Sequence, residues 1–339
     1  MLHRAGTKPT PARLALALAL AALGADATAA ETWLHPVLPQ SVVKAAPAPR
    51  RGARPVRTPA PARPFPTALS GDASFVELTS GGSYPDPGSA IAPERIDRTF
   101  VRLGGARSMP LTSPKVDGAV TRLEATWAGQ GLATLGVLLH AEASTVEAPA
   151  FEAFLAEAGE RAALAERAKR KETKKLARVV SLESARAFAG VLAPPRAAVT
   201  ADPAEGRDEP LGLPLELVAG VPPLPLRAGT TLTATLLLDG KPLSGGVVRA
   251  FVPWAAAPVA LESDASGVVS LPLEGEGRIL LAAASVRRTA KADRAKGETW
   301  KKADWEVRRT TLELLVLPKA VVPMPAPRGK KPPAKRSPR

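Results

Sequence analysis

His35 is the residue of this sequence best suited to hold a transition metal. It ends the stretch Glu31-Thr-Trp-Leu-His35, in which a carboxylate and an imidazole could join a freed α-amino group if the chain folds back. Nickel and cobalt favour imidazole ligands. In the alternative interpretation, Trp33 and Leu34 pack as a strand while His35 faces outward, and the supply of only three histidines favours it. The metal ligands that the sequence predicts are nonetheless His35 and Glu31, for nickel or cobalt.

Two tryptophans flank a pair of lysines near the end of the chain, at Trp300, Lys301, Lys302 and Trp305. Two indoles beside ammonium groups could form a ligand or partner patch through cation–π contacts. Alternatively, Trp305 enters a hydrophobic core at the start of a strand and Trp300 caps a loop, because tryptophan is largely buried in most proteins. Both interpretations stay open for Trp300, and burial is favoured for Trp305.

The sequence gives little support to enzyme chemistry. It has no Cys, which excludes disulfides, thiolate metal sites, iron–sulfur clusters and cysteine nucleophiles. It also lacks the Gly-x-Ser-x-Gly elbow, the phosphate-binding loop, the dinucleotide fingerprint and the His-Glu-x-x-His helix. His140 is predicted to be a surface residue at the end of a strand. We therefore predict a non-catalytic protein with no cofactor besides the metal considered above.

The first 29 residues have the pattern of a signal peptide. Basic residues precede the apolar run Leu14–Leu23, and Ala27-Thr-Ala29 places small residues where a signal peptidase reads them. The apolar run is too short to span a bilayer, and no later segment reaches the roughly 18 apolar residues of a membrane helix. We expect an exported protein of the periplasm or cell envelope that is not transmembrane after cleavage.

Positive charge is concentrated in two Pro-rich and Ala-rich segments. Residues 44–66 and the tail from 321 each hold six basic residues and no acidic one, within a formal net charge of +14. Such composition cannot offset the entropy of ordering, so both segments are predicted to be disordered arms. They are either solvated linkers or tethers to anionic lipid or to an anionic cell-wall polymer. Nucleic acid is not an expected partner, because the arms lack interleaved aromatic residues for base stacking.

Alternating apolar residues and turn signals predict a mainly β protein with two β-sandwich-like domains. The expected N-terminal domain spans 30–205, with the basic insert 44–66 and one amphipathic helix at about 149–175. The expected C-terminal sandwich spans 206–318, and a basic tail follows at 319–339. Strands are predicted at 31–43, 74–78, 98–103, 120–127, 132–142, 211–218, 230–238, 243–252, 267–273, 278–285 and 305–317. Asp239-Gly240 is a strong hairpin signal.

Several stretches resemble the DUF4198 family. They include Arg207–Val218, Leu226–Gly229, Leu238–Val247, Asp264–Gly267 with Leu271-Pro-Leu273, Ala303-Asp-Trp-Glu306, Phe151–Gly159 and Thr32-Trp-Leu34. The resemblance implies an exported bacterial protein whose second domain is similar to transthyretin-like or carboxypeptidase-regulatory-like sandwiches. Family members commonly begin the mature chain with a His, and Ala30 stands at that position here, which weakens the metal prediction. The turn residues within these matching stretches have mainly architectural explanations.

Two functions follow as expectations. The resemblance implies a non-catalytic accessory or binding protein linked to nickel or cobalt uptake, with a membrane transporter or another envelope component as its partner. The alternative is a structural or adhesive envelope module that uses its basic arms to hold an anionic envelope polymer and its sandwich to hold a protein partner.

Overall fold

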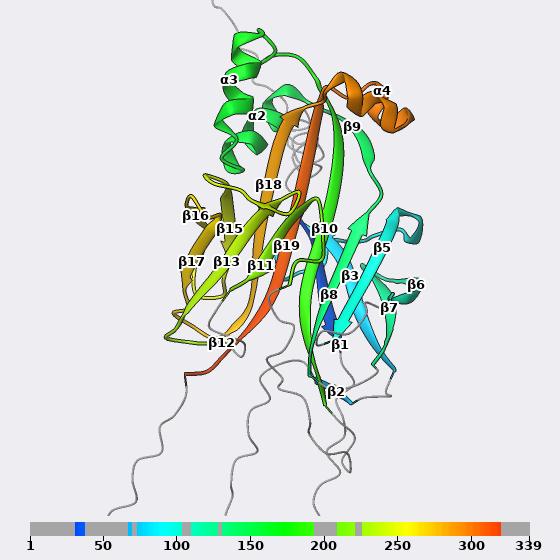
Figure 1. The fold of residues 1–339 in the computed structure, drawn as a ribbon, viewed down its shortest axis with the longest axis vertical. Coiled ribbons are helices and arrows are strands. Elements are labelled where there is room, and N and C mark those ends of the chain that lie inside the picture. The colour runs from blue at the N-terminus through cyan, green and yellow to red at the C-terminus, as the bar shows by residue number, and fades with distance from the viewer. Residues whose placement is uncertain are drawn as a thin grey trace, which may run out of the picture.

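The structure is a computed structural model that describes residues 31–37, 67–69, 73–103, 110–127, 131–192, 209–220 and 226–319. These residues are mainly β, as predicted, and form three sheets with a few short helices (Figure 1). The predicted signal peptide, the insert 44–66, the segment 193–207 and the tail after Lys319 lie outside the described residues.

The first sheet has five strands: four follow the order β1-β3-β7-β6, and the fifth, β4, pairs with β3. Their bounds are β1 Glu31–Val37, β3 Ala73–Gly81, β4 Ser89–Ala90, β6 Thr112–Asp117 and β7 Val120–Thr126. In β7, Leu123 and Ala125 are buried while Arg122 and Glu124 are exposed, which is the period of a strand with one face on a core. That core is shared with the first part of the large sheet.

The large sheet has the order β16-β15-β18-β19-β10-β8-β5; β2 and β9 pair with β10, and β12 pairs with β19. The bounds of its longer strands are β5 Ile96–Leu103, β8 Gly131–Leu139, β10 Ala177–Leu192, β18 Gly277–Arg288 and β19 Trp305–Leu317. The shorter strands are β2 Thr67–Leu69, β9 Glu142–Val146, β12 Leu226–Arg227, β15 Val247–Phe251 and β16 Val259–Glu262.

The third sheet packs on the second part of the large sheet. It contains β11 Leu215–Ala219, β13 Thr231–Leu238, β14 Lys241–Pro242 and β17 Val268–Pro272. Its apolar face forms one hydrophobic core with β15, β18 and β19. The predicted hairpin is confirmed, because Asp239 and Gly240 join β13 to β14 with φ angles of 49° and 74°. Two sandwiches therefore share one long central sheet.

β10 is the longest strand of the described chain, and the sequence did not predict it. It pairs in parallel with β19, where Val179 lies opposite Trp305, and antiparallel with β8. Its sequence, ARVVSLESARAFAGVL, places the polar side chains of Ser184 and Arg186 at fully buried positions, which hides the apolar alternation of a strand. The sheet passes from the first half of the chain to the second through this pairing.

Glu216 explains why Arg186 can be buried beside the motif Leu211–Glu216. Glu216 Oε1 accepts hydrogen bonds from Arg186 Nη1 at 2.7 Å and from the backbone N–H of Leu211 at 2.6 Å. Its other oxygen accepts the N–H groups of Gly212 and Leu213 at 3.1 and 3.2 Å. Both charged side chains are at most 1% exposed. The carboxylate thus ties β10 to the segment that enters β11.

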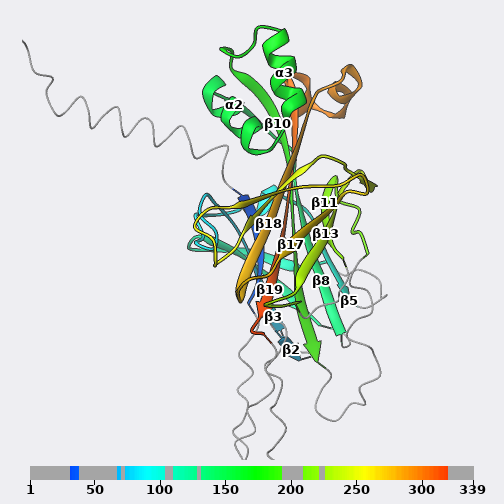
Figure 2. The ribbon, with the colours of Figure 1, turned by 90° about the vertical axis from the view of Figure 1, so that its left-hand side faces the viewer.

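The single helix predicted at 149–175 is wrong in its extent. The chain forms α2 over Ala148–Glu157 and α3 over Arg161–Lys169, and residues 170–176 form a turn. Gly159 separates the helices at φ 71°, and a Cβ there would lie 2.2 Å from Val247 Cγ2. The short elements η1 Pro93–Arg95, η2 Lys291–Lys296 and α4 Glu298–Lys301 complete the described fold. α2, α3 and α4 lie at the same end of the long strands (Figure 1). Figure 2 shows α2 and α3 at this end after the view is turned by 90°.

Glu160, between α2 and α3, gives a pH-dependent prediction. Its Oε1 accepts the backbone N–H of Val286 at 2.8 Å, yet burial raises the pKa of the carboxyl above its ordinary value of 4.5. A carboxyl whose folded pKa is raised contributes most to stability below its unfolded pKa and loses that contribution as pH rises through the folded pKa. Glu160→Gln keeps the acceptor and removes the ionised form.

We therefore expect the Glu160→Gln protein to unfold at higher urea concentration than the wild type at neutral pH. The difference should shrink to nothing as the pH falls below 4.5. Exposed Glu147 on the same segment supplies the control, since Glu147→Gln should show no such pH-dependent difference. A difference between Glu160→Gln and wild type that is constant across pH would contradict the prediction.

Candidate functional site

His35 lies in β1 at the contact between the first sheet and the large sheet, with 17% of its side chain exposed. Its Nδ1 lies 2.8 Å from Glu313 Oε1 in β19. The Arg278 guanidinium of β18 lies against both ring nitrogens, with Nη1 2.6 Å from Nδ1. A carboxylate only accepts, so Nδ1–H of His35 donates to Glu313. A guanidinium only donates, so Arg278 Nη1 donates to Nε2, and its approach to Nδ1 is a contact and not a hydrogen bond.

Strand pairing brings these distant residues together. Thr311 Oγ1 donates to the carbonyl oxygen of Thr32 at 2.5 Å and holds β1 against β19. β18 is the antiparallel neighbour of β19, with Arg278 opposite Leu315. The sequence therefore folds Arg278 and Glu313 onto the same part of the sheet as His35.

Tyr84 joins the cluster from the turn between β3 and β4. Its ring meets that of Trp33 edge to face, with centroids 5.5 Å apart. Burial, followed by the negative charge of Glu313, raises the pKa of the Tyr84 phenol far above its ordinary value, while Arg278 opposes the shift. The phenol is therefore a neutral group that keeps its proton throughout the physiological range.

A cavity of about 400 Å³ opens beside this cluster. Arg278 and Tyr84 supply its charged group and its hydroxyl, and most of its remaining wall is apolar. The lining residues are Tyr84, Pro85, Phe251, Val252, Pro253, Ala255, Ala256, Ala257, Pro258, Gly277 and Arg278. Volumes of this size hold small molecules, and a few convergent polar groups in an apolar wall fix their orientation.

The structure does not bring Glu31 to His35. Glu31 forms an ion pair with Arg249, and Arg249 also pairs with Glu157 at 3.0 Å. Burial raises the pKa of Glu31, and the positive charge of Arg249 partly opposes that shift. Each predicted ligand thus has a guanidinium against it, which repels a metal cation.

No group of three or more His, Cys, Asp or Glu residues that could hold a metal occurs in the described part of the chain. Metal binding by His35 with Glu31 stays a prediction from the sequence.

The two tryptophans of the predicted patch lie in different hydrophobic clusters. Trp305 is 1% exposed and packs with Phe151 of α2, their ring centroids 5.8 Å apart, and Arg288 lies over its indole. Trp300 is 7% exposed and packs with Val180. Neither indole forms an exposed surface with the lysines between them.

Of those lysines, Lys301 pairs with Glu298 and Lys302 is exposed. His140 is exposed directly after β8, as predicted, with Nδ1 3.7 Å from Asp97.

Sequence reasoning missed Arg278, Glu313 and Tyr84. Glu313 could have been noticed in the sequence, because it is the one acidic residue in the largely apolar second half of β19, residues 310–317. A charged residue within a strand that is otherwise buried needs a partner of opposite or complementary chemistry. That rule predicts a partner for Glu313 but does not identify His35, 278 positions away.

No curated protein matches this chain. Two solved structures that resemble it are described as "D0-D1 domain of Intimin" and "D00-D0 domain of Intimin". The first is 10% identical and covers 74% of this chain and 95% of its own, with a TM-score of 0.17. The second is 11% identical and covers 64% and 86%, with a TM-score of 0.15. These TM-scores are too low to support a conclusion. None of the described helices is long and apolar enough to cross a membrane.

The model of the family described as "Domain of unknown function (DUF4198)" matches residues 141–287. This segment runs from β9 to the end of β18 and contains the motifs Leu211–Glu216 and Asp264–Gly267. It includes Arg278 of the cavity and excludes His35. The resemblance to DUF4198 expected from the sequence is thus confirmed over residues 141–287, where this chain matches the model of that family.

Proposed function

We propose that the protein is a non-catalytic, exported accessory protein that binds a small acidic molecule in the cavity beside Arg278. The observation that carries the proposal is the chain of contacts from Glu313 through His35 to Arg278, which ends at the wall of a largely apolar cavity. Glu313 fixes the His35 tautomer, and His35 in turn orients the guanidinium. A guanidinium held in this way is suited to a carboxylate or phosphate.

The ligand has an apolar body and one anionic group. Phe251 and the apolar wall exclude water from the body of the ligand, and Tyr84 offers a neutral hydroxyl near the charged group. Among the described residues no carboxylate forms an ion pair with Arg278, whose guanidinium contacts His35, so its positive charge is available to an incoming anion. An amide of the same shape lacks the charge that Arg278 recognises.

Export rests on the signal-peptide pattern of the first 29 residues, and the periplasm or cell envelope is the proposed location. Linkage to nickel or cobalt uptake, and a membrane transporter as partner, remain expectations from the family resemblance. The adhesive alternative depends on the arms at 44–66 and after 321, which lie outside the described residues.

Binding is tested with octanoate, octyl phosphate and neutral octanamide by isothermal titration calorimetry. A charge-assisted hydrogen bond is worth about 1.5–3 kcal/mol, so Arg278→Gln should weaken octanoate or octyl phosphate binding by about tenfold or more. Octanamide should bind wild type and variant equally. Arg98→Gln, which alters an exposed arginine of β5, is the matched control.

Two outcomes would overturn the proposal. One is that neither acidic probe binds the wild-type protein. The other is that Arg278→Gln and wild type bind the acidic probes with equal affinity.

A further inference from the structure

Among the described residues, charge is segregated along the long axis of the fold. The end that carries α3, the turn 170–175, η2 and α4 comprises residues 160–175 and 287–304, and we call it the basic end (Figures 1 and 2). It contains fourteen basic and six acidic residues, a net charge of +8. The remaining described residues contain fourteen basic and twenty-one acidic residues, a net charge of −7.

Each acidic residue of the basic end already has an ion-pair or hydrogen-bond partner. Glu166 and Glu172 pair with Arg288, and Asp293 pairs with Arg287 and Lys296. Glu298 pairs with Lys301, Asp304 pairs with Arg178, and Glu160 accepts the N–H of Val286. Exposed lysines without an ion pair to any described residue remain: Lys169, Lys171, Lys174, Lys175, Lys291 and Lys302. Their positive charge is directed to an external partner or to solvent.

The lysine-rich turn is held rigidly by a buried arginine. Arg167 is 1% exposed, and its Nη2 donates to the carbonyl oxygens of Glu172 and Lys175 at 2.7 and 3.1 Å. Glu152 accepts from its Nε, and Phe151 lies under its guanidinium. The turn that presents Lys171, Lys174 and Lys175 is therefore organised before any partner arrives, which lowers the entropy cost of binding.

Lys171 occupies a backbone position that favours glycine. Its φ is 56°, directly after α3, where a left-handed residue closes many helices and glycine is the usual choice. A lysine there costs about 1 kcal/mol or more. The sequence thus accepts a less stable turn and keeps an exposed positive charge there.

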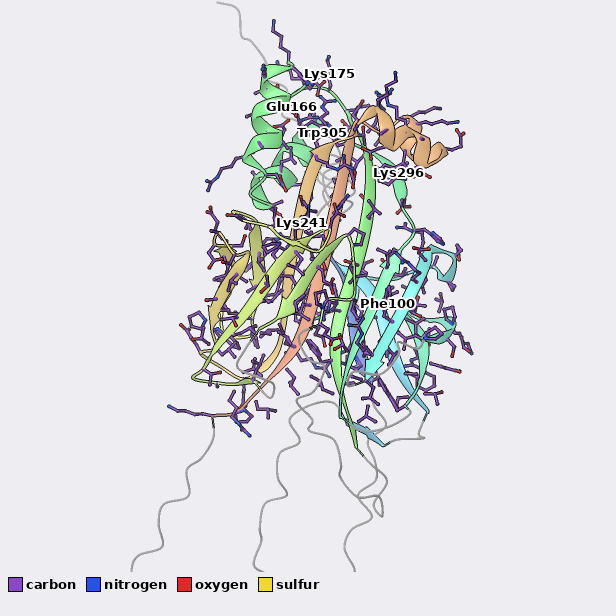
Figure 3. The ribbon with its side chains drawn as sticks, in the orientation of Figure 1. Phe100, Glu166, Lys175, Lys241, Lys296 and Trp305 are labelled. Atoms are coloured by element: carbon purple, nitrogen blue, oxygen red, sulfur yellow. The ribbon has the colours of Figure 1, made fainter. Side chains whose placement is uncertain are left out.

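We propose that the basic end is a docking surface for an anionic phospholipid membrane. Its lysines come from two segments, residues 169–175 and 291–302, which lie on either side of the ends of β18 and β19 (Figure 1). Figure 3 labels one lysine of each segment, Lys175 and Lys296. Because these lysines come from two separate segments at one end of the described fold, they suit a plane of charge better than a single linear polymer. Both nearby indoles are buried, so the surface lacks the exposed aromatic rings that stack nucleic-acid bases.

The test measures co-sedimentation with phosphatidylcholine vesicles that contain about one third phosphatidylglycerol. All proteins carry Gln at the twelve basic positions of 44–66 and of the tail, so that the arms do not mask the basic end. A basic residue near an anionic surface is worth about 1 kcal/mol. Lys171→Gly with Lys174→Gln and Lys175→Gln should therefore weaken vesicle binding about tenfold or more at low salt.

The matched control replaces three exposed lysines outside the basic end, Lys115, Lys241 and Lys319, with Gln, and should bind as before. The glycine at 171 is favoured by the backbone, so the triple variant should unfold at the same temperature as its parent or higher. Arg278→Gln should leave vesicle binding unchanged, which separates this inference from the proposed ligand cavity. Equal losses in the two lysine variants would overturn the proposal. So would absence of vesicle binding by the parent, including the case in which the parent is retained by heparin or DNA.

Discussion

Glu216→Gln is expected to lower the free energy of unfolding by about 3–5 kcal/mol, because it leaves the buried Arg186 guanidinium without its counter-charge. It also replaces one carboxylate oxygen by an NH₂ group, which cannot accept the N–H groups that Glu216 now receives. Urea unfolding followed by circular dichroism measures the loss. The effect should exceed that of any exposed charge substitution in the protein.

Glu209→Gln is the matched control. Glu209 pairs with Arg102 in a largely exposed salt bridge, which is worth about 0–1 kcal/mol. The double variant Arg186→Met with Glu216→Leu should recover part of the lost stability, because it removes both buried charges. It still leaves the N–H groups of residues 211–213 without the Glu216 acceptor and the carbonyl oxygens of Glu209 and Leu217 without the Arg186 donor. A loss below 1 kcal/mol for Glu216→Gln would show that Arg186 finds another partner or reaches water.

Trp305→Ala is the second large effect, with an expected loss of about 3–5 kcal/mol. The indole is 1% exposed and packs between Phe151 and the Arg288 guanidinium, so its removal leaves a large cavity beneath α2. Thermal unfolding and the loss of near-ultraviolet circular dichroism would report it. Trp305→Phe should cost less, because a smaller ring refills part of the space.

Lys302→Ala provides the comparison for the same segment. Its side chain is exposed, so the change in unfolding free energy should stay within about 0.5 kcal/mol. If Trp305→Ala were as mild as Lys302→Ala, the indole would be accessible, and the sequence-based hypothesis of a recognition patch would regain support.

Local sequence patterns predicted the strands in which burial leaves a regular pattern of apolar residues. β7, β13 and β19 have one apolar face or a continuous apolar run, and the Asp239-Gly240 turn has a chemistry that few other structures use. β10 escaped prediction because buried polar residues such as Arg186 interrupt its apolar pattern and depend on partners elsewhere. The helix was overextended because charged residues such as those of 170–175 suit a helix and a turn equally well.

The candidate site could be predicted only in part. His35 was recognisable from its residue type, whereas its partners are set by strand register. Arg278 lies 243 positions away in the sequence, and no local pattern encodes that distance. The prediction that joined His35 to Glu31 rested on closeness in the sequence, but an extended strand carries residues four positions apart about 13 Å from each other.

The parallel pairing of β10 with β19 has a consequence for how the chain acquires its structure. Arg178 and Asp304, beside this pairing, are 126 residues apart, so the centre of the large sheet cannot close until the chain has been made as far as β19. Sheets built from such distant segments fold slowly, because the entropy cost of closing the long loop must be met before strand pairing contributes any stability. Newly synthesised chains of this protein should therefore stay open for longer than a protein of local hairpins. We propose that this chain is exported. The slow closure of the sheet then keeps the chain unfolded, and so able to be transported, until it has crossed the membrane.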